Sequence, residues 1–450
     1  MARLFGTDGV RGIANVPPMT AEMVLEIGRA TAYVCKAHNN RRHKIVIGKD
    51  TRVSGYMLES ALTAGICSMG VDVLLVGPMT TPGIAFITHS IRADAGMVIS
   101  ASHNPYQDNG IKVFGHSGYK LPDEQEHLIE QAIFAYRRAG RKAEPYPLSV
   151  DPGLDQRYVD SLAATFPQSL EGLRLVVDCG NGAASHLAAQ LFEGLGAQVL
   201  TLGCSPDGRN INLGCGALHL EALRDEVRRE GAGLGVAFDG DADRAIFVAR
   251  SGKIVDGDAV LLVVARSWLA KGRLTGPEGT PTVVATVMSN LGLERALTAR
   301  GIRLLRTPVG DKYVLEEMLR SGALLGGEQS GHIIFLDCAT TGDGLLTALR
   351  VLEIMRESGL GLDELTEELE IYPQRLVNVR IRNKKPLSKL PAVLAEIRAA
   401  EEAFGPAGRV LVRFSGTEPL ARVMVEGPEL AQVEAFAARI ARAIQHELGA

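Results

Sequence analysis

The chain has 450 residues, of which 46% are hydrophobic and 22% charged, and its formal net charge is −4. A chain of this length exceeds what a single hydrophobic core supports, so we expect several globular domains. The slightly acidic balance and the lack of any long apolar run argue against a nucleic-acid-binding or membrane-spanning protein.

The six cysteines are scattered, with no Cys-x-x-Cys pair. In a chain this long, that pattern predicts free thiols in a reducing compartment rather than a disulfide framework or a zinc site. The first twelve residues are polar and glycine-rich, without the apolar core of a signal peptide. We therefore expect a cytoplasmic protein.

Three segments share one order of predicted elements: a strand, a helical stretch, a strand that begins with glycine, and a third strand opened by small residues. The three sets of strands are 44–48, 70–76 and 94–100, then 173–178, 196–200 and 231–238, then 282–286, 301–305 and 321–327. Strands that alternate with helices predict βαβ units and mainly parallel sheets. We interpret the pattern as three α/β domains, with a rhythm shared by chance as the alternative.

A distinctive loop follows the third strand of each segment. The loops are Ser100-Ala101-Ser102-His103-Asn104-Pro105, Asp239-Gly240-Asp241-Ala242-Asp243 and Gly327-Glu328-Gln329-Ser330-Gly331-His332. Ligands of α/β sheets bind beyond the carboxyl ends of the strands. Equivalent loops from three domains are therefore expected to line one cleft, each with its own chemistry.

The second loop places carboxylates on alternate residues directly after an apolar strand. Alternate side chains of an extended segment point the same way, so the three carboxylates can converge on a hard cation such as Mg²⁺. A plain solvated turn is one alternative. An EF-hand is excluded because Arg244 and Arg250 stand where Gly and Glu are required. A phosphohydrolase that uses the first Asp as its nucleophile stays open at this point.

After residue 370 the order of elements changes. Strands at 376–381, 409–414 and 421–426, with helices at 390–404 and 428–448, predict a smaller α+β domain. Its last two strands are joined by Arg413-Phe414-Ser415-Gly416-Thr417-Glu418-Pro419. An arginine, two hydroxyls and a glycine suit a phosphate-binding loop, with an ordinary hairpin turn as the alternative. The chain contains no Walker A motif, dinucleotide fingerprint or Gly-x-Ser-x-Gly elbow.

Together the four loops resemble those of the α-D-phosphohexomutase superfamily, over essentially the whole chain. In chain order they are similar to its phosphoserine loop, metal loop (239–244), sugar-binding loop and phosphate-binding loop (413–419). The resemblance implies three tandem α/β domains with mixed sheets and a C-terminal α+β lid domain around a central cleft. The boundaries we expect are 1–153, 154–255, 256–369 and 370–450.

Within the superfamily, the chain looks most like the phosphoglucosamine mutases. The matching stretches are 5–12 (Phe-Gly-Thr-Asp-Gly-Val-Arg-Gly), 108–112, 118–121 and Gln329. Two places depart from that branch. Lys312 stands where an arginine is expected, and Leu213-Gly214 precedes Cys215-Gly216 where more polar residues are usual.

The resemblance also implies a reaction, the interconversion of glucosamine 6-phosphate and glucosamine 1-phosphate through glucosamine 1,6-bisphosphate. Its product would supply UDP-N-acetylglucosamine for the cell wall. Spacing alone does not choose between Ser100 and Ser102, whereas the resemblance assigns Ser102 as the phosphorylated nucleophile. One Mg²⁺ per chain is implied at Ser102, Asp239, Asp241 and Asp243.

The remaining roles are implied in the same way. The catalytic group is Ser102 with His103, Lys112, Arg11 and His332. The substrate-binding group is Glu328, Ser330, Arg413, Ser415, Gly416, Thr417 and Arg244. The identity of the general base is left open.

Other classes explain less of the chain. A phosphoglucomutase or phosphomannomutase shares nearly every motif and is the main alternative. A phosphatase with an Asp nucleophile explains only the loop at Asp239, and a non-enzymatic sugar-phosphate-binding protein leaves Ser102 without a role. The partners that we expect are a phosphosugar substrate and a second copy of the chain in a homodimer, with neither nucleic acid nor membrane.

Overall fold

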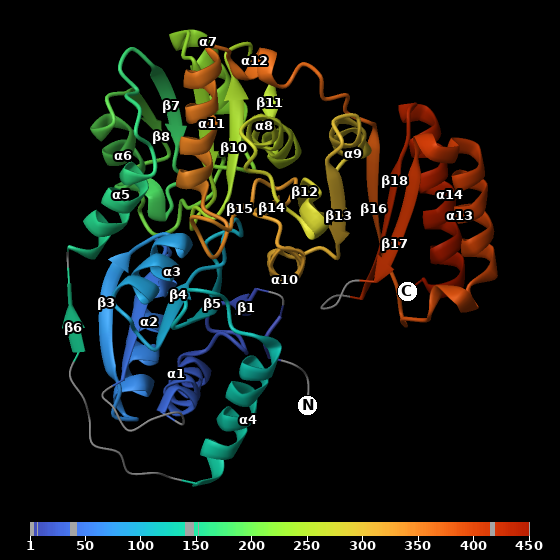
Figure 1. Cartoon of the computed structure of the whole chain (residues 1–450). Helices are drawn as coiled ribbons and strands as arrows, with labels where there is room; N and C mark the ends of the chain where they lie inside the picture. The colour runs from blue at the N-terminus through green and yellow to red at the C-terminus, as the bar shows by residue number, and fades with distance from the viewer. Residues whose placement is uncertain are drawn as a thin grey trace. The chain divides into compact units, whose positions relative to one another are not determined.

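The computed structural model describes residues 4–6, 8–36, 43–139, 148–151, 153–414 and 419–449. The chain divides into two compact units, residues 1–288 with 302–367 and residues 289–301 with 368–450. Within the described residues the first unit holds three sheets and the second holds one (Figure 1). None of the described helices is long and apolar enough to cross a lipid bilayer.

The first sheet has the strand order β1-β5-β4-β2-β3-β6. Its strands are β1 (Val10–Ile13), β2 (Lys44–Lys49), β3 (Asp72–Pro78), β4 (Ala95–Ile99), β5 (Asp108–Gly115) and β6 (Leu148–Val150). Its helices are α1 (Ala21–Lys36), α2 (Ser54–Cys67), α3 (Thr81–Ser90) and α4 (Asp123–Ala139). Helix α1 packs closely on α2 because Gly65 has no side chain: a Cβ there would lie 2.2 Å from the Leu25 carbonyl oxygen.

The second and third sheets repeat the parallel core of the first. The second has the order β11-β10-β9-β7-β8, and the third β13-β12-β14-β15. The second comprises β7 (Arg174–Asp178), β8 (Gln198–Leu202), β9 (Leu234–Phe238), β10 (Ala245–Ala249), β11 (Ile254–Val255), α5 (Leu154–Ala164), α6 (Ala188–Gly194) and α7 (Glu221–Glu230). The third sheet comprises β12 (Thr282–Thr286), β13 (Arg303–Thr307), β14 (Leu325–Gly327) and β15 (Ile333–Phe335). The helices from this part of the chain are α8 (Gly257–Ala270), α10 (Asp311–Ser321), α11 (Gly344–Ser358) and α12 (Leu362–Leu365).

One feature of these three sheets positions the predicted loops. In each sheet a central strand runs parallel to its neighbour and then turns back into an antiparallel partner: β4 into β5, β9 into β10 and β14 into β15. The three loops at these turns are those that follow the third predicted strands. The expectation of α/β domains with mixed sheets is therefore confirmed.

The second unit is built on an antiparallel sheet of order β16-β18-β17. Its elements are β16 (Gln374–Arg380), β17 (Arg409–Phe414), β18 (Leu420–Glu426), α9 (Leu291–Thr298), α13 (Pro391–Phe404) and α14 (Leu430–Leu448). Apolar residues of the sheet pack with Val393 and Phe404 of α13 and with Ile440 and Ile444 of α14. The predicted α+β domain is confirmed, with element ends within a few residues of those expected.

Candidate active site

The loop after β4 holds Ser102 buried in a left-handed backbone conformation, with φ +55°. That conformation costs a non-glycine residue about 1–2 kcal/mol, so its surroundings have to impose it. Ser100 Oγ accepts a hydrogen bond from the Ser102 amide at 2.9 Å and donates one to Asp50 Oδ2 at 2.6 Å. Ser100 therefore stabilises the conformation of the loop. Ser102 Oγ instead points to the second loop, where it donates a hydrogen bond to Asp239 Oδ2 at 2.5 Å.

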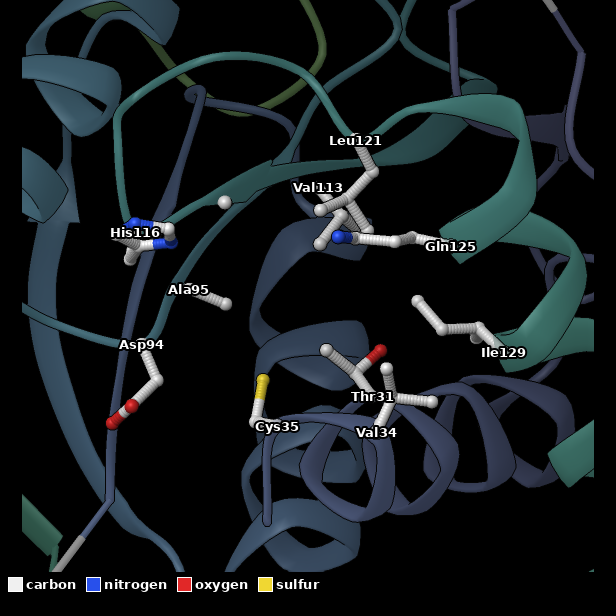
Figure 2. Close-up of a pocket in the computed structure, with 11 residues that line it drawn as sticks. Thr31, Val34, Cys35, Asp94, Ala95, Val113, His116, Leu121, Gln125 and Ile129 are labelled. Carbon is white, nitrogen blue, oxygen red and sulfur yellow. The ribbon is translucent and has the colours of Figure 1, made fainter. Parts of the chain in front are cut away.

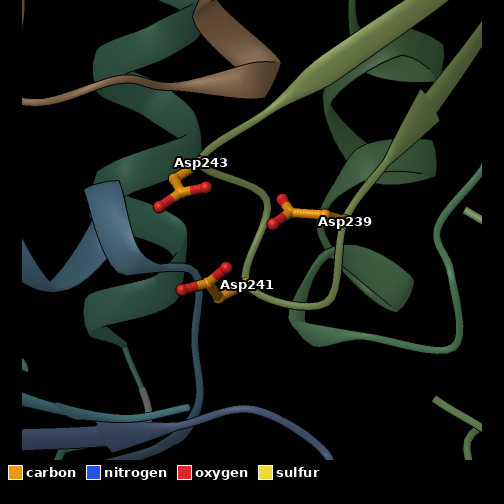
Figure 3. A group of neighbouring side chains, drawn as sticks. All are labelled: Asp239, Asp241 and Asp243. Atoms are coloured by element: carbon orange, nitrogen blue, oxygen red, sulfur yellow. The ribbon is translucent and has the colours of Figure 1, made fainter. Parts of the chain in front are cut away.

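Asp239, Asp241 and Asp243 converge as predicted, but through a turn and not along an extended segment: the Ala242 amide donates to the Asp239 carbonyl oxygen at 3.0 Å, and Ala242 is left-handed, with φ +55°. They lie between β9 and β10, they are at most 3% exposed, and one carboxylate oxygen of each lies within 4.8 Å of the others. Figure 3 shows the three carboxylates turned toward one another across the loop. Thr81, the first residue of α3, also donates to Asp241 Oδ2 at 2.5 Å.

The electrostatics of this triplet suit a bound cation. Burial, together with the charges of Asp243 and Asp241, raises the pKa of Asp239 well above its usual value. Asp241 Oδ1 and Asp243 Oδ1 are buried and have no hydrogen-bond partner. Buried carboxylate oxygens without donors are costly, and oxygen-only ligation is what Mg²⁺ prefers. The residues therefore fit a divalent metal ion such as Mg²⁺.

Lys112, on β5, provides the positive charge closest to the triplet. Its Nζ donates to Asp241 Oδ2 at 2.8 Å and to Asp243 Oδ2 at 3.1 Å, and lies 3.3 Å from Asp8 Oδ2. Burial opposes the charge of Lys112, but the three carboxylates outweigh it and raise its pKa well above the usual value. Lys112 is therefore held as an ammonium ion between them.

Asp8 is a site residue that the sequence did not single out. Its carboxylate pairs with Arg11 and accepts from Lys120 Nζ at 2.6 Å, and Lys120 pairs in turn with Asp311. Burial opposes this charge, but the pKa of Asp8 is still lowered because Lys112, Lys120 and Arg11 surround it. Its only sequence signal is its place in the stretch 5–12.

His103 and Arg244 lie close to Ser102 Oγ. His103 Nδ1 is 3.1 Å from Ser102 Oγ and 3.2 Å from Arg244 Nη1. Burial and the positive charges of Arg244 and Arg11 lower the pKa of His103 to about 4. The ring is therefore neutral near pH 7, and the arginine donor assigns Nδ1 as the acceptor.

The third loop reaches the triplet through His332. His332 is buried, its Nε2 accepts the Gly342 amide at 3.0 Å, and its Nδ1 lies 3.7 Å from Asp243 Oδ1. Glu328 accepts the Gly310 amide at 3.0 Å, and Ser330 donates to Glu328 at 3.3 Å. The third loop also meets the start of β10, where the Ala245 amide donates to the Gly331 carbonyl oxygen at 3.1 Å, whereas the Gln329 side chain lies beside Asp256 at the start of α8.

Lys312 and Cys215, which depart from the pattern of the phosphoglucosamine mutases, both have hydrogen-bond partners in the structure. Lys312 Nζ donates to Asp123 Oδ1 at 2.5 Å and to Glu126 Oε2 at 3.3 Å, both on α4. Its charge therefore joins α10 to α4. Cys215 accepts a hydrogen bond from Asn181 Nδ2 at 3.5 Å.

The predicted phosphate-binding loop belongs to the second unit. Arg413 is on β17, where its backbone faces Arg422 of β18. Ser415, Gly416 and Thr417 lie outside the described residues, so their role stays a prediction.

A pocket of about 340 Å³ lies apart from these residues, against the first sheet (Figure 2). It is lined by Cys35 of α1, Val113 of β5, Ile129 of α4 and their neighbours, and by no predicted site residue. Burial, with the nearby charge of Asp94, raises the pKa of Cys35 to about 12, so its thiol is unreactive near neutral pH.

Comparisons with known proteins agree with this geometry. Models of phosphoglucomutase/phosphomannomutase α/β/α domains I, II and III match residues 2–139, 156–252 and 256–372, and the model of the C-terminal domain matches residues 376–443. The exact boundaries at 153, 255 and 369 stay a prediction.

Proteins named phosphoglucosamine mutase are similar over the whole chain. The one from Solibacter usitatus is 58% identical over 446 residues, and the one from Anaeromyxobacter dehalogenans is 54% identical over 460, with 99% of both chains covered in each case. A solved phosphoglucomutase/phosphomannomutase family protein from Burkholderia thailandensis is 26% identical, with a TM-score of 0.82, and 100% of this chain and 99% of that chain are covered. An Aspergillus fumigatus N-acetylphosphoglucosamine mutase shares the fold at 18% identity, with a TM-score of 0.64 over 98% of this chain and 95% of that chain. The chain therefore belongs to the phosphoglucosamine mutase family of the α-D-phosphohexomutase superfamily.

Proposed function

We propose that this protein interconverts glucosamine 6-phosphate and glucosamine 1-phosphate, with Ser102 as the phosphoryl carrier and glucosamine 1,6-bisphosphate as the intermediate. The main support is the hydrogen bond of 2.5 Å between Ser102 Oγ and Asp239, within a buried triplet suited to Mg²⁺. A serine that touches a metal site can carry a phosphoryl group whose charge the metal offsets.

The reaction has two transfers. In the first, the free hydroxyl oxygen of the sugar attacks the phosphorus on Ser102, the bond between phosphorus and Ser102 Oγ breaks, and the hydroxyl gives up its proton. In the second, Ser102 Oγ attacks the other phosphoryl group of the bisphosphate, the bond between that phosphorus and the sugar oxygen breaks, and the proton released in the first transfer returns to the sugar oxygen. The product then leaves with one phosphate, and Ser102 is phosphorylated again.

Asp239, Asp241 and Asp243, with Ser102, would hold a divalent cation, which would supply positive charge beside the moving phosphoryl group. Arg11 and the Arg244–His103 pair surround the same place. Their charges stabilise the equatorial oxygens of the transition state, where electrostatics and positioning dominate catalysis. His103 lies beside Ser102 Oγ, with its Nδ1 3.1 Å from that oxygen.

We assign the proton of the sugar hydroxyl to Lys112 and His332, which both face Asp243. Because its carboxylate partners hold Lys112 as an ammonium ion, Lys112 can take that proton only by passing one of its own to Asp241 or Asp243. Glu328 and Ser330 would bind two ring hydroxyls, which stay in place when the sugar exchanges its two ends.

We assign the phosphate that is not transferred to Arg413, Ser415, Gly416 and Thr417 of the second unit. A fixed binding loop for this group explains how one site can serve both transfers. The phosphoglucomutase or phosphomannomutase alternative is not favoured, because the relatives at 51–58% identity are named phosphoglucosamine mutase. Supply of UDP-N-acetylglucosamine, the cytoplasmic location and the homodimer stay predictions.

The test is to compare Ser102→Ala with Ser100→Ala. Ser102→Ala should abolish mutase activity because covalent catalysis has no substitute for its nucleophile. Ser100→Ala should keep much of the activity. Mass spectrometry of the native protein should find phosphate on the peptide that contains Ser102. Full activity of Ser102→Ala would overturn the proposed mechanism.

A further inference from the structure

Arg52 is a fully buried arginine between β2 and α2, with 0% of its surface exposed. A guanidinium ion is expensive to bury unless its N–H groups have partners. Its Nε donates to Asp50 Oδ2 at 2.7 Å. The same Asp50 oxygen accepts Ser100 Oγ, which in turn accepts the Ser102 amide. Arg52 is therefore tied to the Ser102 loop through its counter-ion.

The other two nitrogens of Arg52 bind the main chain of that loop. Nη2 donates to the carbonyl oxygens of Ser102 and Asn104, both at 2.8 Å. Nη1 donates to the carbonyl oxygens of Pro105 and of Asp108, the latter at 3.1 Å. The planar guanidinium group of Arg52 thus donates hydrogen bonds to four carbonyl oxygens within seven residues of the chain. The ammonium group of a lysine cannot reproduce this geometry.

These hydrogen bonds fix the orientation of the loop's carbonyl oxygens relative to Ser102 Oγ. The Ser102 carbonyl oxygen faces Arg52, while Ser102 Oγ faces Asp239. Carbonyl oxygens carry partial negative charge and would repel a phosphate dianion if they turned toward Oγ. Asn212, which follows the second sheet's strand β8 in sequence, supports the same orientation, because its Nδ2 donates to the carbonyls of Ser102 at 2.9 Å and Asn104 at 3.1 Å.

We propose that Arg52 is a positioning residue for phosphoryl transfer: it holds the carbonyl oxygens of the loop inward, so that Ser102 keeps its left-handed backbone and presents Oγ to the metal loop. This inference rests on the proposed role of Ser102. Because Arg52 is fully buried and its three nitrogens are bound to the protein, we do not expect it to contact the substrate. Its loss should therefore lower kcat and leave the binding of the sugar phosphate largely intact.

The experiment compares Arg52→Lys with Arg350→Lys. Arg350 is a matched control, since it is also buried and donates to a carboxylate and to a main-chain carbonyl, those of Glu353 and Thr165. Arg52→Lys keeps the positive charge beside Asp50 and removes the planar guanidinium group. We expect kcat to fall about 30-fold or more with KM within about threefold, and Arg350→Lys to stay within about twofold of the wild type.

Hydrogen exchange of the amides in residues 100–108 gives a second readout, which does not depend on activity. We expect exchange in this segment to become faster in Arg52→Lys and to stay unchanged in Arg350→Lys. A kcat within threefold of the wild type, unchanged exchange in residues 100–108, or a loss that appears in KM alone would each overturn the inference.

A second variant keeps the inference testable if Arg52→Lys does not fold. Asn212→Ala removes one donor to two of the same carbonyls, so kcat should fall about three- to tenfold with KM unchanged. Wild-type kcat in that variant would then contradict the inference. Failure of the proposed function is distinguishable, because it appears in the unsubstituted protein as absent mutase activity, while exchange in residues 100–108 still reports whether Arg52 holds the loop.

Discussion

Ser102 Oγ and Asp239 Oδ2 lie 2.5 Å apart, although they follow strands of two different sheets and are 137 residues apart in the sequence. The proposed nucleophile and the proposed metal loop are thus parts of one site. Because the two loops are both buried, the position of each depends on the packing of the two sheets.

The first prediction concerns the metal loop. Asp241→Asn should lose most activity at ordinary Mg²⁺ concentrations and regain only part of it with excess Mg²⁺, because one charged ligand is missing. Activity measured against Mg²⁺ concentration checks this. The matched control is Asp160→Asn on the exposed surface of α5, which should behave as the wild type. An enzyme that stays fully active in EDTA would contradict the assignment.

A second prediction follows from the low pKa of His103. Its folded value of about 4 lies below the usual value near 6.5, so the folded protein favours the neutral ring. The stability that His103 contributes is complete above pH 6.5 and is lost as the pH falls toward 4. An NMR titration of the imidazole in the metal-free protein without phosphate on Ser102 should give a midpoint near 4, and His103→Gln should lose less stability over that range. A midpoint at pH 6 or above would refute this.

The local parts of the site could be predicted from the sequence, since the signals lie within a few residues. Three aspartates on alternate residues after a strand were enough to predict their convergence, although the extended segment assumed for it is a turn closed by the bond from the Ala242 amide to the Asp239 carbonyl oxygen. Partners that come from distant strands and helices carry no such signal. Thr81, Asp8 and Arg52 reach the site only because helix α3, strand β1 and the turn after β2 fold onto it.

The fold, too, could be predicted from the sequence only where the signals are local. The repeated order of strands and helices predicted α/β units, because hydrophobic strands and glycine-led turns are local features. The resemblance supplied the mixed character of the sheets, which periodicity did not give: the antiparallel partners β5, β10 and β15 depend on pairing between segments. Lys312 is a similar case, since its partners on α4 lie almost 190 residues away in sequence.

The third prediction tests the phosphate-binding role of the second unit. Arg413→Ala should chiefly raise KM, by roughly 10- to 150-fold, as expected for the loss of a charge-assisted hydrogen bond of about 1.5–3 kcal/mol. The control is Arg439→Ala on α14, where the arginine pairs with Glu396. An unchanged KM for the sugar phosphate in Arg413→Ala would show that this loop does not bind the phosphate.

A fourth prediction concerns Gln329, which marks the amino-sugar branch in the sequence. Its side chain lies beside Asp256, the residue that caps α8 through the Ala259 amide. Gln329→Ala should therefore lower the melting temperature while changing the preference between amino and neutral sugars by less than about twofold. A loss of tenfold or more in that preference would mean that Gln329 contacts the substrate.

Substrate choice is the central claim, and its direct test is kcat/KM for glucosamine 1-phosphate, glucose 1-phosphate and mannose 1-phosphate, each with its matching bisphosphate. Glu328 and Ser330 would bind hydroxyls common to glucose and glucosamine, so discrimination has to come from contacts near carbon 2. The account predicts a preference for the amino sugar of tenfold or more, which corresponds to about 1.4 kcal/mol in the transition state. Equal or better use of either neutral sugar would contradict it and make this protein a hexose phosphomutase.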